Sequence, residues 1–173
     1  INSVNALEGI RFYVSFACSW AFAELKKMEG NAKIIKFISR DENLHVAITQ
    51  NIIKYLTENK EEGFQDIIKK SEDKVYEAYK IAVEAEKDWA NYLFSKGNLV
   101  GLTNDSLNTY IEWLCNNRLQ SIGYKKLYPN AKNNPLAGWL DSYYDSKKLQ
   151  VAPQETELSS YVKGVDNTIT ENA

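Results

Sequence analysis

Two side chains in the middle of one predicted helix could bind a metal ion together. Glu42 and His45 lie in the stretch Glu-Asn-Leu-His, and His45 is the only histidine of the chain. Residues three apart share one face of an α-helix, so this spacing directs a carboxylate and an imidazole to the same spot. Di-iron and di-manganese carboxylate bundles use the Glu-x-x-His pair twice, with one further Glu from each of two other helices. Alone, the pair is more often part of a solvated helix face, so its spacing leaves both interpretations open.

The residues around this pair strengthen the metal hypothesis. Its apolar neighbours Ile38 and Leu44 predict that the pair lies near the core, and a buried carboxylate needs a partner. A second candidate, Glu8, is followed at four-residue steps by Phe12 and Phe16, which places a carboxylate and two phenyl rings on one helix face. The alternative is a glutamate near a helix N-terminus beside two ordinary core phenylalanines. Spacing does not decide between these two interpretations.

Helices are the elements that must position these residues. The apolar spacing predicts four of them, at about residues 4–29, 31–57, 63–94 and 103–123. Gly30 is placed to end the first helix and Asn31 to cap the second, while Thr103 or Asp105 can start the fourth. The fourth helix should bury several apolar residues and the methylenes of Arg118. Beyond it, prolines interrupt the chain, residues 139–144 form at most a short helix, and the end from about residue 150 should be an extended tail.

Composition supports an all-α fold and excludes several functions. The 173 residues carry 21 Lys plus Arg and 23 Asp plus Glu, a net charge of −2, which argues against nucleic acid or an anionic membrane as partner. Only 8 Gly and 3 Pro interrupt the chain, which favours long helices. The most apolar stretch, residues 12–23, is shorter than the roughly 20 residues of a membrane span, and no signal peptide is expected. Cys18 and Cys115 are predicted to be reduced core thiols of a cytosolic protein, with a disulfide as the alternative.

Five separated segments of the chain strongly resemble, in order, the small, radical-generating subunit of class Ia ribonucleotide reductase. These segments are residues 4–18, 28–35, 40–45, 86–94 and 151–161. The resemblance favours the di-iron class Ia type over the manganese-using class Ib type. It implies an all-α, ferritin-like di-iron carboxylate helix bundle, here partial. Residues 1–149 would form the C-terminal part of this helical domain, and residues 150–173 a flexible tail that docks onto the large subunit.

The resemblance also implies roles for individual residues. The metal ligands of the family fall on Glu8, Glu42 and His45, and the apolar pocket around its radical tyrosine falls on Phe12, Phe16 and Ile38. Asp41 falls on the aspartate that hydrogen-bonds the radical-transfer path beside the metal. In the tail, Tyr161 falls on the tyrosine that passes the radical between subunits, and Glu155 on a glutamate that couples docking to radical transfer.

A complete site of this family needs a second Glu-x-x-His, which a chain with one histidine cannot supply. We therefore expect a fragment, or the C-terminal piece of a split subunit, that holds half of the iron ligands. Its expected partners are the N-terminal half of the small subunit, the large subunit and a second copy of the small subunit, in the cytoplasm. The expected activity is that of a ribonucleoside-diphosphate reductase, absent from the isolated chain. The alternatives are a non-catalytic helical interaction module and another ferritin-like di-iron oxygenase, and the latter would have no use for the tail.

Overall fold

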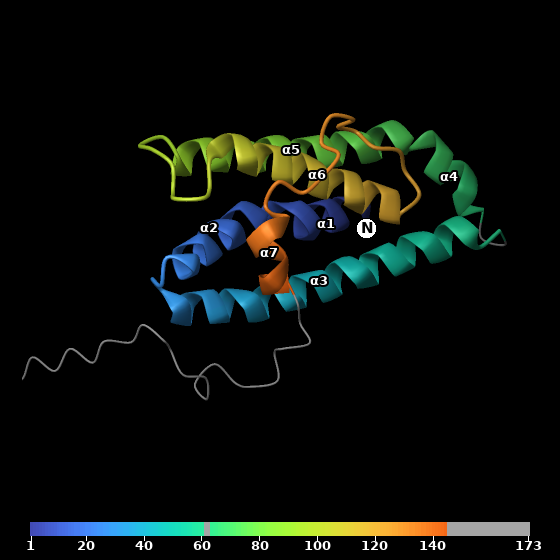
Figure 1. Ribbon diagram of the computed structural model, residues 1–173. Helices are drawn as coiled ribbons and strands as arrows, with labels where there is room; N and C mark the ends of the chain where they lie inside the picture. The colour runs from blue at the N-terminus through green and yellow to red at the C-terminus, as the bar shows by residue number, and fades with distance from the viewer. Residues whose placement is uncertain (61–62, 145–173) are drawn as a thin grey trace, which may run out of the picture.

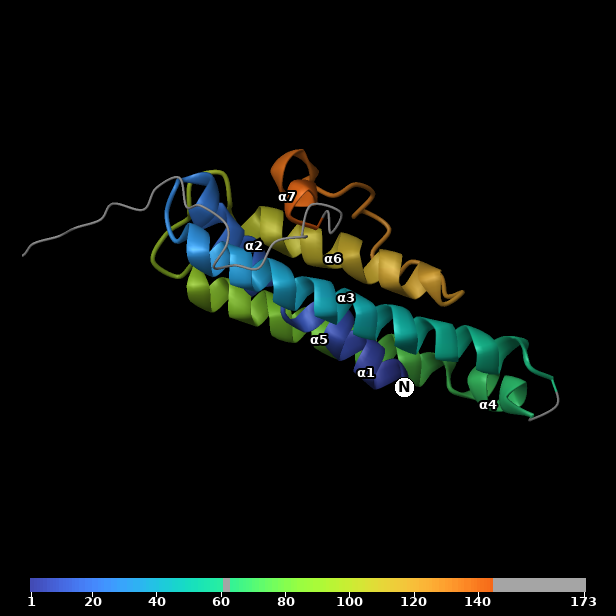
Figure 2. The same ribbon diagram turned by 90° about the horizontal axis from the view of Figure 1, so that it is seen from below.

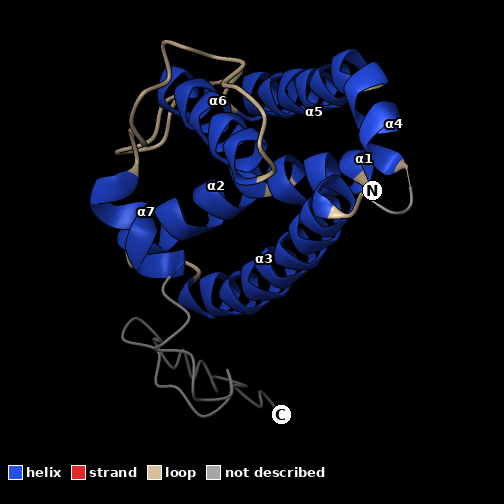
Figure 3. Cartoon of the chain, turned by 90° about the vertical axis from the view of Figure 1, so that its right-hand side faces the viewer, coloured by secondary structure: helices blue, strands red, loops and turns tan. Residues whose placement is uncertain are grey.

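The computed structural model describes residues 1–60 and 63–144, and within these ranges it contains helices and loops but no strand (Figure 3). The elements are α1 (Asn2–Ala6), a π-helical segment η1 (Leu7–Arg11), α2 (Tyr13–Glu24), α3 (Glu29–Glu58), α4 (Phe64–Lys70), α5 (Glu72–Leu93), α6 (Asn104–Ser121) and α7 (Ala137–Tyr144). The all-α prediction is therefore confirmed. None of these helices is long and apolar enough to cross a membrane.

The helices form three levels in Figure 1, and Figure 2 shows the same helices from below, with α3 nearest to the viewer. α5 and α6 lie side by side above the rod formed by α1, η1 and α2, and the long helix α3 runs below this rod. The short helix α4 leads from the end of α3 to the start of α5. α7 packs across α2 and α3. The central rod is therefore covered from both sides, which explains why α2 is apolar on almost every face.

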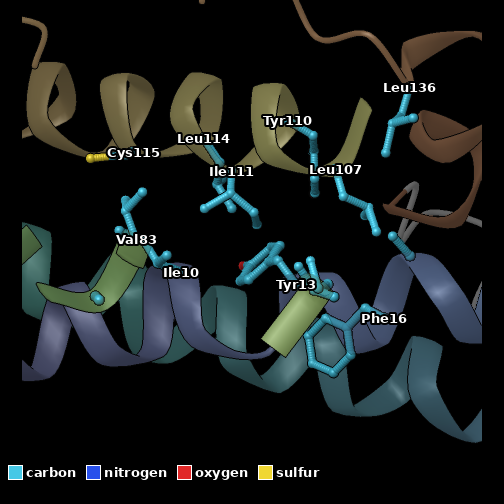
Figure 4. Packing of buried hydrophobic residues seen from close by; sticks show 14 of the residues in the cluster. Ile10, Tyr13, Phe16, Val83, Leu107, Tyr110, Ile111, Leu114, Cys115 and Leu136 are labelled. Carbon is cyan, nitrogen blue, oxygen red and sulfur yellow. The ribbon is translucent and has the colours of Figure 1, made fainter. Parts of the chain in front are cut away.

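The core fills the space between α6 and the central rod (Figure 4). From α6, Leu107 and Ile111 point down toward Ile10 and Tyr13 of the rod, and all four are at most 1% exposed. At the far end of the rod, aromatic rings pack around Trp20, and its indole N–H donates to the carbonyl of Ala32 at 3.1 Å. The neighbouring rings come from α7: Tyr143 stacks on Trp20 at a centroid distance of 5.2 Å, and Tyr144 meets it edge-on at 4.9 Å.

The predicted boundary between the first two helices is wrong. α2 already ends at Glu24, and α3 begins at Glu29, so Gly30 and Asn31 lie inside α3 instead of ending and capping helices. The turn is made by Lys26 and Met28, whose φ angles are 58° and 53°. Non-glycine residues adopt this left-handed conformation infrequently, so the sequence carries no strong signal for it.

The remaining predictions about the elements have mixed outcomes. The predicted third helix is broken at Ser71 into α4 and α5. The predicted start of the fourth helix is confirmed: Thr103 caps α6, its hydroxyl accepts from the Ser106 amide at 3.1 Å, and the Ser106 hydroxyl accepts from the Thr103 amide at 3.0 Å. α7 confirms the short helix near residue 139. The predicted extended tail lies outside the described residues.

Candidate metal centre

Three potential ligands from two elements meet on one side of the central rod. Glu8 belongs to η1, whereas Glu42 and His45 belong to α3, and one ligand atom from each lies within 4.8 Å of the others. Nδ1 of His45 is 3.4 Å from Oε2 of Glu42 and 3.9 Å from Oε1 of Glu8. The structure thus brings together the three residues that the sequence singled out as ligands. It is the one such cluster of three or more His, Cys, Asp or Glu side chains in the described part of the chain.

The chemistry of this donor set fits a metal ion. Within the described residues, the ion pairs of Glu8 and Glu42 involve His45 and no lysine or arginine. Two carboxylates and an imidazole without a cationic partner suit iron or manganese. For ligand bonds of about 2 Å, donor atoms on one ion lie up to about 4 Å apart, and both distances from His45 are within that limit.

The cluster lies at the surface of the described chain. The side chains of Glu42 and Glu8 are 18% and 23% exposed, and that of His45 is 48% exposed. Ile38 and Leu44, which were expected to hold the pair near the core, are themselves 42% and 59% exposed. That expectation is wrong for the isolated chain, because the central rod covers only one side of α3 and leaves these apolar side chains exposed.

Each of the other predicted site residues has a definite place, except the two in the tail. The rings of Phe12 and Phe16 stack at a centroid distance of 6.2 Å. Phe16 is buried, whereas Phe12 is 42% exposed, as is Ile38. Asp41 lies on the surface and pairs with Arg40 at 3.1 Å. Glu155 and Tyr161 lie outside the described residues.

The π-helical segment that carries Glu8 was not predicted. Such segments are rare and occur frequently at functional sites. Where η1 gives way to α2, the amide of Val14 is one of the helix-start N–H groups that lack an intrahelical acceptor. The carboxylate of Glu86, from α5, accepts from this amide at 3.0 Å, and its other oxygen lies 3.5 Å from Nε of Arg11. Glu86 therefore ties the junction to α5.

Glu86 is the buried carboxylate that the sequence analysis missed. It is 3% exposed, and burial raises its pKa to about 7, although the Val14 amide and the charge of Arg11 act in the opposite direction. A signal for it exists in the sequence. The apolar stripe of α5 runs through Tyr79, Val83 and Ala90, and Glu86 occupies the position of this stripe between the last two.

Two polar contacts hold the central rod against α3 on either side of the ligands. Before Glu8, the buried side chain of Asn5 donates to the carbonyl of Val46 at 3.2 Å and accepts from the hydroxyl of Tyr79. After Glu8, the hydroxyl of Tyr13 donates to Oδ1 of Asn43 at 3.0 Å. Burial raises the pKa of Tyr13 above its usual value, so this hydroxyl keeps its proton at neutral pH.

Comparison with known proteins adds a decisive observation. Residues 1–135 match the family model described as "Ribonucleotide reductase, small chain". The chain belongs to this family. The ribonucleoside-diphosphate reductase beta subunit of Buchnera aphidicola is 45% identical over 98% of this chain and 45% of its own length. The corresponding subunit of Escherichia coli O157:H7 is 45% identical over 95% of this chain and 43% of its own length. That of phage T4 is 40% identical over 98% of this chain and 44% of its own length.

The solved structures of the reductase small-chain family agree with this assignment. The R2 subunit of Clostridium botulinum ribonucleotide reductase superposes with a TM-score of 0.73 and 33% identity, over 81% of this chain and 43% of that subunit. The predicted ferritin-like helical fold is thereby confirmed. The chain spans less than half the length of these relatives. Cys18 and Cys115 are free thiols, as predicted, but only Cys115 is fully buried, whereas Cys18 is partly exposed.

Proposed function

We propose that this chain is a part of a ribonucleotide reductase small subunit and supplies half of the ligands of its di-iron centre. In the complete subunit, iron and O2 would generate a tyrosyl radical, which passes to the large subunit for the reduction of ribonucleoside diphosphates. The ligands from this chain would be Glu8, Glu42 and His45. The observation that carries the proposal is the meeting of these three donors, from two separate elements, without a cationic partner.

The surface around the donors supports the view that more of the subunit packs here. On α3, the exposed apolar residues Ile38, Ile48 and Ile52 flank His45 at helical spacings, one before it and two after it, so the histidine lies within an apolar stripe. η1 contributes the exposed Leu7. Soluble monomers rarely expose a continuous apolar surface of this kind without a partner. We infer that the remaining part of the small subunit covers it and brings the other ligands.

The remaining predicted residues would serve the radical. Phe12, Phe16 and Ile38 would form a wall that excludes water and reductants from the radical tyrosine. Asp41 would orient the radical-transfer path beside the metal through a hydrogen bond. Tyr161 would pass the radical across the subunit interface, and Glu155 would couple that step to docking of the large subunit.

A metal titration tests the ligand assignment on this chain alone. Because His45 is the only histidine, its ring protons give an unambiguous NMR signal for Co²⁺ binding. We expect weak binding of Co²⁺, and both Glu8→Gln and His45→Gln should remove it. Because His45→Gln lacks the histidine ring protons, Co²⁺ binding to this variant is measured by visible absorption. The matched control is Glu84→Gln, an exposed carboxylate of α5. Equal binding by all four proteins would contradict the assignment.

Complementation tests the wider proposal. The rest of the small subunit from the Escherichia coli relative, supplied as a second chain, should bind this one and raise its affinity for iron. Only the reconstituted pair should show a tyrosyl radical in electron paramagnetic resonance after exposure to Fe²⁺ and O2. A radical on the isolated chain would contradict the proposal. A pair that forms and remains indifferent to iron would favour a non-catalytic interaction module.

A further inference from the structure

The guanidinium group of Arg118 joins the two elements that carry the proposed ligands. Arg118 lies on α6 and belongs to neither element. Its Nε donates to the carbonyl of Gly9 at 3.3 Å, and Nη2 donates to Oδ1 of Asn43 at 3.3 Å. Gly9 directly follows the ligand Glu8 in η1, and Asn43 directly follows the ligand Glu42 in α3. One rigid planar group thus binds the neighbour of each carboxylate.

The hydroxyl of Tyr13 closes this network. It accepts from Nη2 of Arg118 at 2.7 Å and donates to Oδ1 of Asn43 at 3.0 Å, so the three side chains form a closed set of hydrogen bonds. The guanidinium also lies 5.4 Å from the centre of the Tyr13 ring. A lysine could not reproduce these contacts, because a single ammonium lacks the fixed fork of donors.

Gly9 packs directly against the arginine. A Cβ atom at this position would lie 3.4 Å from both Cγ and Nε of Arg118, at the short end of ordinary van der Waals contact. Within the described residues, Arg118 forms no ion pair, and its partners are a carbonyl, an amide and a hydroxyl. A half-buried cation without a counter-ion carries a desolvation cost. The N–H donors of the guanidinium bind η1 and α3 at the same time, and this double contact offers a reason for an arginine at this position.

We propose that Arg118 is a positioning residue for the metal ligands: it sets η1 against α3 so that Glu8 reaches Glu42 and His45. This inference rests on the proposed function, because it assigns a purpose to the distance between the two elements. The competing explanation is that Arg118 only stabilises the packing of α6.

Asn116 provides a matched control for that explanation. It lies on the same helix, is 1% exposed and makes four hydrogen bonds, but all of them go to the loop that follows α6. Asn116→Ala should destabilise the fold, although Asn116 forms none of these hydrogen bonds with η1 or α3. If Arg118 only stabilises the packing of α6, Arg118→Met should behave like Asn116→Ala: both variants should be less stable, and neither should change the affinity for Co²⁺.

The first measurement is the dissociation constant of Co²⁺, followed through the ring protons of His45. Arg118→Met should raise it about 10- to 100-fold, the usual range for groups that orient metal ligands. Tyr13→Phe keeps the buried ring, removes only the hydroxyl, and should also raise the dissociation constant. This variant tests the network even if Arg118→Met folds poorly. Asn116→Ala should leave the dissociation constant unchanged. An unchanged constant in Arg118→Met and Tyr13→Phe, or an equal rise in Asn116→Ala, would overturn the inference.

The second measurement does not depend on metal. Amide hydrogen exchange of residues 7–11 should become faster in Arg118→Met and Tyr13→Phe, relative to amides in the middle of α5, but not in Asn116→Ala. If the wild-type chain fails to bind Co²⁺, the ligand assignment fails, and the exchange rates still decide the role of Arg118. Unchanged exchange in residues 7–11 would then overturn the inference.

Discussion

Replacing Glu86 by glutamine should make the chain more stable at neutral and alkaline pH. The carboxyl group of a glutamate in the unfolded chain titrates near 4.5, whereas burial raises the pKa of Glu86 to about 7 in the fold. The unfolded state therefore releases this proton first, and the free energy of unfolding should fall as the pH rises from about 4.5 to about 7. The difference between these pKa values corresponds to about 3 kcal/mol, at about 1.4 kcal/mol per pH unit.

Glu86→Gln keeps an oxygen that can accept from the Val14 amide but removes the buried charge. The variant and the wild type should therefore unfold with similar free energies near pH 4.5. Above pH 7 the variant should be more stable by up to about 3 kcal/mol, reduced by whatever the contact with the half-exposed Arg11 contributes. Urea denaturation followed by circular dichroism between pH 4.5 and 8 measures this difference.

The control is Glu84→Gln on the same helix, whose carboxylate is exposed and whose stability difference from wild type should change little with pH. A difference between Glu86→Gln and wild type that stays flat across this range would refute the reasoning. So would a difference that shrinks as the pH rises.

Three further predictions concern single side chains. Trp20→Ala removes a fully buried ring that packs against two tyrosines of α7, and should cost about 3–5 kcal/mol in thermal or chemical denaturation; a loss below 1 kcal/mol would contradict the described packing. Thr103→Ala removes the cap of α6 and should cost about 1 kcal/mol, whereas Thr103→Ser should cost little. In a complete subunit with its large partner, Tyr161→Phe should abolish nucleotide reduction while the stored radical survives in electron paramagnetic resonance. Normal turnover in that variant would refute the relay.

The spacing of chemical groups along helices was predictable from the sequence because it depends on helical geometry alone. Glu42 and His45 share a face whatever surrounds them, because both lie in the regular helix α3, whereas Glu8 lies in the π-helical segment η1. Their meeting across two elements was a stronger expectation that rested on the family resemblance. The Thr103 cap was also visible, because its side chain acts on backbone groups only three residues away.

Features that depend on tertiary contacts could not be predicted in the same way. Gly30 was assigned as a helix end, but Lys26 and Met28 adopt the left-handed conformation instead. The methylenes of Arg118 were predicted to be buried, but nothing in the neighbouring sequence shows that its guanidinium reaches Gly9 and Asn43. The junction between η1 and α2 likewise uses an acceptor from α5, far away in sequence.

The π-helical segment makes the length of this part of the chain critical. A π-helical turn closes its hydrogen bonds over five residues in place of the four of an α-helix, so η1 holds about one residue more than an α-helical turn would. Deleting one residue from Leu7–Arg11 would let the rod continue as an ordinary α-helix, with α1 and α2 close to their present register. The side chains inside the turn, Glu8 among them, would change direction, and Glu8 would lose its place beside Glu42 and His45. Relatives that keep these three ligands should therefore tolerate substitutions in this segment far better than insertions or deletions.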